Sequence, residues 1–548
     1  MLFNSNVFLF AFLPVAMVGY YLLAHYWSVL ACKVWLCLAS FFFYGWWNPV
    51  FLVLLGCSIA FNYSLSLTLK GDDEGAGARQ TTWLTIGVTA NLLLLVYFKY
   101  LFPLLGFLHR LGWTHVDFGS VILPIGISFF TFTQIGYLVD CREGQLRERG
   151  LLNYVLFVTF FPHLIAGPIL HHREIMPQFA NEATYRFKAD NLAAGLTLFA
   201  FGLFKKVIFA DTIAPWAETG FAHLQGIRML PAWSVAVAYS MQLYFDFSGY
   251  SDMAVALGIM FGVKLPLNFN SPYKSSSIIE FWQRWHMTLT RYLTLLLYNP
   301  ISLWVARRRQ RKGLSSGRQA ASTLTGFTTM IVFPTFTTML LAGIWHGAGL
   351  QFVIYGVLYG VYLSVNHAWR LVYPPKAKRA AQSTLARFWS GLWPVVVTYV
   401  AVLVGQIFFR ADSVGDALTL LGGMSGVRGS GVPLPIPPND LKYLWVTQHW
   451  LLGHGLIVVG SRDAYNAVTL PLVTNVLLGL GLGAIAFGAP NVYQIMGTWS
   501  PALTKVHPSS WVRWRWQPTW PWAIAAAVMV FVASLRFDRA ARFLYFQF

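Results

Sequence analysis

Long apolar runs separated by short polar or basic stretches dominate the sequence. About 20 consecutive apolar residues are needed for one membrane span. By that measure the candidate membrane segments lie near residues 7–26, 30–47, 49–69, 82–102, 119–139, 152–170, 192–213, 231–262, 323–345, 350–370, 390–410, 469–489 and 519–535. The pattern therefore predicts an all-α polytopic membrane protein.

Two of these segments are expected to be broken or re-entrant. Phe161–Pro168 contains two prolines and a glycine, and Leu123–Ser128 contains one of each. Proline removes a backbone donor and clashes with the preceding turn, so such stretches interrupt a helix.

The loops between the segments predict the orientation of the chain. Lys33 follows the first segment, Arg79 lies after the third, and Arg142 and Arg149 follow the fifth. Cytoplasmic loops are enriched in Lys and Arg, so these loops are expected in the cytoplasm and the N-terminus outside. The most basic loop, Arg307–Lys312, is interpreted as a solvated loop touching anionic lipid rather than as a contact for an anionic cytosolic donor.

One titratable residue stands between two uncharged runs. His346 lies in the glycine-rich stretch Leu341–Leu350, between residues 323–344 and 350–365. A helix over 323–344 would be about 33 Å long, which places His346 at the end away from the basic loop before it. An ionisable residue at membrane depth indicates function, so His346 is a candidate catalytic residue.

A second histidine follows a stretch of mixed polarity. Residues 275–286 combine Trp282 and Trp285 with Arg284 and His286 at helical spacing, which predicts an interfacial or cavity-lining helix. A neutral imidazole can take a proton from a hydroxyl and pass it on. The alternative for either histidine is a hydrogen-bonded core residue.

A third polar cluster interrupts the apolar segment 231–262. Asp246, Ser248 and Asp252 supply acceptors and donors there, and buried carboxylates need partners. Arg284 and Lys264 are the candidate partners, which would place Arg284 in a buried pair. Ser248 lacks the Gly-x-Ser-x-Gly context of a nucleophile, so a serine nucleophile is disfavoured.

His163, His171 and His172 raise the question of a metal. The only carboxylate or cysteine at a ligand spacing from them is Glu174, so an interfacial basic turn with Arg173 is favoured, and no metal is predicted.

Composition agrees with a membrane protein. The 548 residues are 56% hydrophobic and 11% charged, against roughly 25% charged in soluble domains. The 39 Lys and Arg outnumber the 20 Asp and Glu, but they are scattered between apolar segments, which disfavours nucleic-acid binding. The four cysteines have no zinc or disulfide spacing.

The chain is expected to form a single membrane domain over residues 1–548. The Gly- and Pro-rich stretch 425–468 is a predicted extramembrane loop, and the first segment has no cleavage signal and is expected to remain as a helix. P-loop, Rossmann and His-Glu-x-x-His motifs are missing from the sequence, which argues against an ATP-driven pump or a metalloprotease.

Several stretches together resemble the membrane-bound O-acyltransferases (MBOAT). They are Leu123–Phe132, Phe160–Pro168, Gln242–Met253, Asn268–Tyr273, Glu280–His286 and Gly343–Gly347. The opening Met1–Phe10 and the closing Phe543–Phe548 resemble the bacterial branch that acetylates alginate and other exopolysaccharides.

The resemblance implies a ring of roughly 11 to 13 transmembrane or re-entrant helices around a central catalytic funnel. His346 would be the catalytic base or acyl-relay residue, and His286 would support donor-side chemistry or positioning. The residues expected to line the substrate tunnel or to support the site are Trp345, Asp246, Ser248, Asp252, Arg284 and Asn270.

The resemblance also implies the substrates. Acetyl from cytosolic acetyl-CoA would cross the bacterial inner membrane to an extracytoplasmic SGNH-type acetyltransferase or a polysaccharide acceptor. This chain departs from the usual pattern at Tyr292–Pro300 and at His171–Glu174, which leaves the polysaccharide and the partner open. The alternatives are export of D-alanyl or another acyl group from a carrier protein, and a non-enzymatic polysaccharide export subunit.

Overall fold

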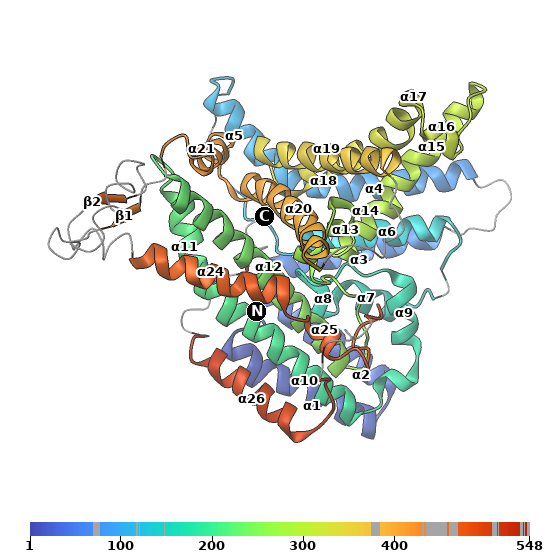
Figure 1. The fold of residues 1–548 in the computed structure, drawn as a ribbon. Coiled ribbons are helices and arrows are strands. Elements are labelled where there is room, and N and C mark those ends of the chain that lie inside the picture. Colours follow the sequence, from blue (N-terminus) through green and yellow to red (C-terminus); the bar gives the residue numbers. More distant parts are fainter. Residues whose placement is uncertain are drawn as a thin grey trace.

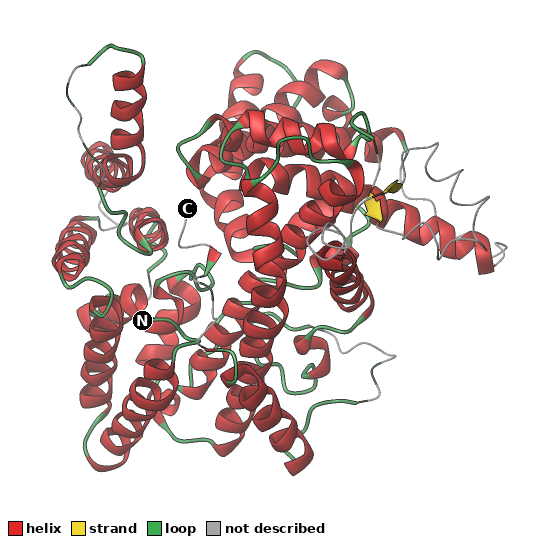
Figure 2. Cartoon of the chain, turned by 90° about the vertical axis from the view of Figure 1, so that its left-hand side faces the viewer, coloured by secondary structure: helices red, strands yellow, loops and turns green. Residues whose placement is uncertain are grey.

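The described part of the chain is mainly helical (Figures 1 and 2). The computed structural model describes all residues except 70–76, 115, 117–118, 120, 147, 374–383, 430–431, 435–456, 460–469, 507–511, 513, 538–540, 542 and 545–548. It describes the backbone alone at 318, 384–389, 432–434, 457–459 and 470.

The α-helices are α1 (Leu13–Tyr26), α2 (Val29–Gly45), α3 (Val50–Thr68), α4 (Gly77–Val96), α5 (Phe102–Arg110), α6 (Ile127–Arg142), α7 (Leu151–Thr159), α8 (Phe161–Leu164), α9 (His172–Ala180), α10 (Ala189–Phe204), α11 (Asp211–Ala222), α12 (Met229–Met260), α13 (Ile278–Trp282), α14 (Met287–Leu293), α15 (Asn299–Arg311), α16 (Arg318–Ala321), α17 (Leu324–Phe327), α18 (Phe333–His346), α19 (Leu350–Val372), α20 (Thr384–Arg410), α21 (Val414–Met424), α24 (Leu470–Gly488), α25 (Val492–Ile495) and α26 (Trp520–Ser534). Wider π-helical turns are η1 (Phe8–Phe12), η2 (Tyr97–Leu101), η4 (Lys205–Ala210), η6 (Thr294–Tyr298) and η7 (Thr328–Val332), and 3₁₀ turns are η3 (Glu182–Tyr185) and η5 (Pro272–Lys274).

The predicted multi-pass membrane architecture is confirmed. Among the described residues, seven helical stretches are long and apolar enough to cross a membrane. They are Phe8–Tyr26, Val50–Thr68, Gly77–Arg110, Ala189–Ala222, Leu324–His346, Ser390–Arg410 and Pro471–Gly488. Other predicted segments form shorter helices, including α2 and α26.

Both predicted interruptions are present, and they touch each other. The segment expected over 119–139 becomes helical only at Ile127, after a turn at Gly126 with φ of 75°. The segment expected over 152–170 ends its first helix at Thr159. A Cβ on Gly126 would lie 2.8 Å from the Leu164 carbonyl oxygen, so this close approach needs glycine.

The centre of the molecule is α12, which spans 32 residues and about 48 Å at 1.5 Å per residue. Every residue from Ala238, within this helix, to Phe261, directly after its end, is buried. A helix buried on all sides belongs to a core. It packs against α10, α11, α21 and α24.

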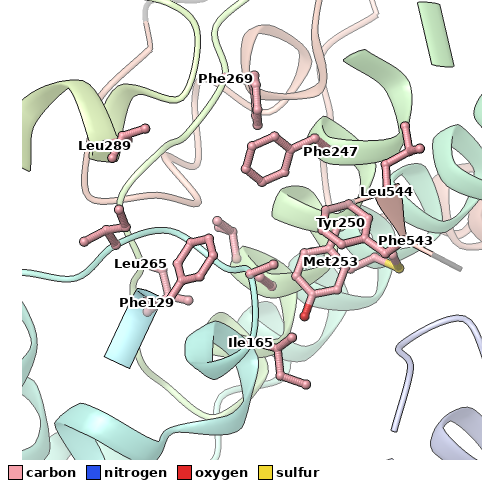
Figure 3. Close-up of a cluster of buried hydrophobic side chains, with 14 of the residues drawn as sticks. Phe129, Ile165, Phe247, Tyr250, Met253, Leu265, Phe269, Leu289, Phe543 and Leu544 are labelled. Carbon is pink, nitrogen blue, oxygen red and sulfur yellow. The ribbon is translucent and has the colours of Figure 1, made fainter. Parts of the chain in front are cut away.

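Segments near both ends of the chain pack on α12. The Tyr250 ring stacks on Phe3 at 4.8 Å and on Phe543 at 4.4 Å between ring centroids. Figure 3 shows Phe543 and Leu544 beside Tyr250 and Phe247.

The described part of 425–468 contains two short strands, the exception to the all-α prediction among the described residues. β1 (Val432–Leu434) pairs in parallel with β2 (Ile457–Val459), and Val432 faces Ile457. Most of the predicted extramembrane loop lies outside the described residues.

Candidate active site

His346 is the last residue of α18 and is 5% exposed. Aromatic rings surround its imidazole: the ring centroids of Trp345, Phe409 and Tyr355 lie 4.6, 5.0 and 5.6 Å away. The following helix α19 can lie close to α18 because Gly343 has no side chain. A Cβ on Gly343 would come within 2.4 Å of the Phe352 carbonyl oxygen. The helix pair α18–α19 thus holds the imidazole inside the protein.

Two residues of the π-helical turn η2 bind the end of α18. The Lys99 ammonium donates to the Trp345 carbonyl oxygen at 2.5 Å, and the Tyr100 hydroxyl donates to the Ile344 carbonyl oxygen at 2.7 Å. The last carbonyls of a helix lack intrahelical partners and carry partial negative charge. The buried side chain of Lys99 therefore fixes the turn that presents His346.

Lys99 was not singled out in the sequence. It is 8% exposed, and its ammonium lies 5.4 Å from the centroid of the Trp345 ring. The signal was available, because Lys99 is a charged residue inside the predicted span 82–102. Such residues are costly in a membrane and indicate function.

His286 follows the short helix α13 and adopts left-handed backbone angles, with φ of 42°. Its Nδ1 lies 2.9 Å from Asn268 Oδ1, which also accepts from the Thr288 hydroxyl at 3.0 Å. The Asn268 amide nitrogen in turn donates to Ser251 at 3.0 Å. This network assigns the proton of a neutral His286 ring to Nδ1.

A small cavity joins the two histidines. His286 and His346 both line a space of about 20 Å³, together with Trp282, Trp285 and Tyr355. A cavity of this size has room for about one water molecule. Residues 275–286 were predicted to form either an interfacial or a cavity-lining helix, and Trp282, Trp285 and His286 line a cavity.

His346 also borders a second small cavity, of about 40 Å³. Lys99, Trp345 and the broken segment Leu123–Phe129 line this space. The predicted helix interruption thus has a structural consequence: it brings irregular backbone to the histidine.

A much larger cavity, of about 950 Å³, lies on the other side of Trp345. Phe132, Tyr292 and Trp345 form part of its wall, and their rings stack at 4.8 and 5.2 Å between centroids. Its polar lining includes Asp140, His171, His172, Arg173 and Arg291. Trp345 therefore separates a cavity of cofactor size from the space that contains His346 and Lys99.

Asp246, Ser248 and Asp252 are absent from the linings of the cavities that His286 and His346 border. Lys206 lies 2.6 Å from Asp246 and 2.7 Å from Asp211, while Lys205 pairs with Asp252 and donates to Ser248. Asp246 also accepts from the backbone of Leu544 at 3.0 Å.

The prediction that Arg284 or Lys264 pairs with these carboxylates is wrong, because their partners are Lys205 and Lys206. The π-helical turn η4 lets the consecutive lysines 205 and 206 reach two positions of α12, an arrangement that spacing along the chain does not reveal. The ion pairs join α12 to η4, and the hydrogen bond from the Leu544 backbone joins α12 to the segment around that residue.

The predicted buried pair of Arg284 is also wrong. Arg284 pairs with Glu280 at 2.8 Å, and the two side chains are 33% and 27% exposed. Its guanidinium also donates to the Asn270 carbonyl oxygen at 3.3 Å. The Asn270 side chain accepts from Asn491 at 2.9 Å. Arg284 and Asn270 therefore tie together loop segments beside the site, and they are absent from the linings of the cavities around His346.

Of the predicted supporting residues, Trp345 alone lines a cavity with His346. The structure brings together His286, His346, Trp345 and the unanticipated Lys99 in an enclosed polar centre inside a helical membrane body. Such a centre is typical of an integral membrane enzyme.

The comparisons identify the class of enzyme. Residues 127–317 match the model of the MBOAT, membrane-bound O-acyltransferase family. The chain belongs to this family and is an acyltransferase.

Two relatives named as O-acetylating enzymes, and a third named as a D-alanyltransferase, show the extent of the similarity. The chain is 37% identical to the probable alginate O-acetylase AlgI of Pseudomonas putida over 560 residues, which is 100% of each chain. It is 39% identical to the peptidoglycan O-acetyltransferase of Helicobacter pylori over 455 residues, covering 78% of this chain and 80% of that protein. The teichoic acid D-alanyltransferase of Bacillus subtilis is 28% identical over 53% of this chain and 69% of that protein.

Proposed function

We propose that this chain takes acetyl from acetyl-CoA at the cytoplasmic face of the bacterial inner membrane and relays it across for O-acetylation of a cell-surface polysaccharide. The names of the two relatives above support acetyl as the group and a polysaccharide as the acceptor. The observation that carries the proposal is the position of His346, between two small cavities and next to the residue that bounds a large one.

The large cavity supports a nucleotide-sized donor. Its volume of about 950 Å³ lies at the upper end of the range for small-molecule sites. Its lining includes Arg173 and Arg291, which pair with Asp140 and Glu174 and whose guanidinium groups suit the phosphates of a coenzyme. Trp345 is also part of the lining, so a thioester bound against it would lie one side chain away from His346.

The chemistry follows from the groups beside Trp345. The acceptor hydroxyl loses its proton to the His346 imidazole as its oxygen attacks the thioester carbonyl carbon. The C–S bond then breaks, and the thiolate leaves with that proton. Negative charge develops on the carbonyl oxygen during the attack, and the Lys99 ammonium in the same cavity is placed to stabilise it.

His286 has a positioning part in this proposal. Its bond to Asn268 and the 4.8 Å contact of its ring with Phe247 hold the imidazole at the wall of the cavity shared with His346. The extracytoplasmic SGNH-type acetyltransferase or the polysaccharide itself would take the acetyl group on the far side.

The two alternatives have weaker support. The D-alanyltransferase relative matches only 53% of this chain, and its acyl group would come from a carrier protein. A polysaccharide channel would need a wide polar path, whereas the cavities beside His346 have volumes of about 20 and 40 Å³.

The donor is tested with purified full-length protein in detergent. Labelled acetyl-CoA and an acyl-loaded carrier protein are offered in parallel with a soluble oligosaccharide acceptor. Transfer from acetyl-CoA, lost in His346→Ala and kept in a variant of the exposed His109, supports the proposal. Transfer from the carrier protein alone would overturn it.

A further inference from the structure

Three side chains of types that can bind a metal ion, Asp140, His171 and His172, meet at the lining of the large cavity. We propose that Asp140, His171 and His172 bind a divalent transition-metal ion of the zinc type, with one coordination position open to the cavity. Asp140 Oδ2 lies 3.0 Å from His171 Nε2 and 3.1 Å from His172 Nδ1. All three ligand atoms lie within 4.8 Å of one another.

These separations suit tetrahedral coordination. Zinc binds imidazole nitrogen and carboxylate oxygen at about 2.0–2.1 Å, so adjacent ligand atoms of a tetrahedral site lie about 3.3 Å apart. The oxygen–nitrogen separations are 3.0 and 3.1 Å. A few tenths of an ångström of movement would open a site among atoms that already converge.

The chemistry of the ligands selects the metal. Imidazole nitrogens favour zinc and its transition-metal neighbours, whereas calcium and magnesium favour all-oxygen sites. Three protein ligands with an open fourth position are typical of zinc sites that bind a further molecule. The three residues line the cavity, so that molecule would come from the cavity.

Neighbouring residues fix the ligands in place. The Arg173 guanidinium lies 3.4 Å from Asp140 Oδ1, the carboxylate oxygen that does not face the histidines. The His172 ring makes edge contacts with Tyr137 and Phe157, at 5.7 and 6.4 Å between centroids. Outer contacts of this kind orient metal ligands.

The carboxylate of this site is Asp140 and not Glu174, the one at a ligand spacing along the chain. Glu174 is close to the histidines along the chain, but it forms a bidentate pair with Arg291 at 2.6 and 2.9 Å. Asp140 comes instead from the last turns of α6, 31 positions before His171. The ligand set is therefore assembled by packing between α6 and α9.

The role of the metal rests on the proposed function. If acetyl-CoA occupies the large cavity, the open position faces an anionic group of the donor, and a phosphate oxygen is the ligand of matching charge. Removing the metal should then weaken donor binding and leave His346, which lies beyond Trp345 and outside the cavity lining, unchanged.

The test uses full-length protein purified in detergent without a histidine tag and stripped with EDTA. Zn²⁺ binding is titrated and counted by elemental analysis, and Co²⁺ is added as an optical probe of tetrahedral geometry. The variants are Asp140→Asn and His171→Ala, and the matched control is His223→Ala, which removes an exposed histidine.

We expect about one Zn²⁺ per chain in the wild type and in His223→Ala, and affinity at least about tenfold weaker in the two ligand variants. Zn²⁺ should also raise the melting temperature of the wild type, a readout that needs no variant. No stoichiometric binding by the wild type, or equal binding by His171→Ala, would overturn the site. Metal binding together with a KM for acetyl-CoA that does not change when the metal is stripped would overturn only the role of the metal in donor binding. If the metal-loaded wild type transfers no acetyl from acetyl-CoA, that result would count against the proposed function and not against the metal site.

Discussion

Replacing Lys99 by methionine tests the polar centre around His346. Methionine keeps most of the length of the side chain but removes the ammonium, which donates to the Trp345 carbonyl oxygen at 2.5 Å and lines the His346 cavity. If the ammonium donates to the thioester carbonyl oxygen as negative charge develops on it, the transition state gains about 1.5–3 kcal/mol, the usual range for a hydrogen bond to a charged group. Since about 1.4 kcal/mol is a factor of ten in rate, we expect kcat to fall about 10- to 100-fold.

Two further variants separate charge from position. Tyr100→Phe removes the neighbouring bond to the Ile344 carbonyl oxygen and should cost about 0.5–1.5 kcal/mol, a few-fold to tenfold in kcat. Lys99→Arg keeps the charge and the donors and should restore part of the activity. Lys312→Met, at the exposed C-terminal end of α15, is the control for loss of one positive charge.

The assay is acetyl transfer from labelled acetyl-CoA with kcat and KM determined separately. Because Lys99 acts beside His346 and not in the large cavity, the KM for acetyl-CoA should change less than kcat. Wild-type kcat in Lys99→Met, with folding confirmed by an unchanged elution profile, would refute this reasoning.

Three other predictions follow from the ion pairs and from the proposed metal site. Lys206→Met leaves Asp246 buried without its cation, so we expect about 3–5 kcal/mol of destabilisation, seen as a lower melting temperature in detergent; an unchanged melting temperature would contradict the pairing. Arg284→Ala breaks the partly exposed pair with Glu280 and the 3.3 Å hydrogen bond to the Asn270 carbonyl oxygen, so stability should change by less than about 1 kcal/mol and transfer by less than about twofold; a large loss of transfer would mean that Arg284 reaches substrate. Stripping zinc with EDTA should lower the melting temperature of the wild type and leave that of His171→Ala unchanged, and an equal fall in His171→Ala would point to other ligands.

Features set by a few neighbouring residues were predictable from the sequence. The breaks at Leu123–Ser128 and Phe161–Pro168 follow from proline and glycine, which act on their own backbone. His346 was identifiable because a single titratable group in an apolar run is rare, and the structure buries it beside His286 as expected for a shared site.

Features made by packing between distant segments were not predictable from spacing. Asp246 pairs with Lys206, which lies 40 positions earlier in the chain, and Asp140 meets His171 from another helix. Many basic residues could neutralise a buried carboxylate, and the choice depends on helix packing. Lys99 differs from these, because its charge within the predicted span 82–102 is visible in the sequence, whereas its burial beside Trp345 comes from packing.

The central claim is that an acetyl group crosses the membrane by way of His346. The most direct measurement uses oriented vesicles that contain the full chain, with labelled acetyl-CoA on the cytoplasmic side and an acceptor on the other. Wild type and a His109→Ala control should place label on the acceptor, and His346→Ala should not. Label reaching the acceptor equally in His346→Ala would contradict the account.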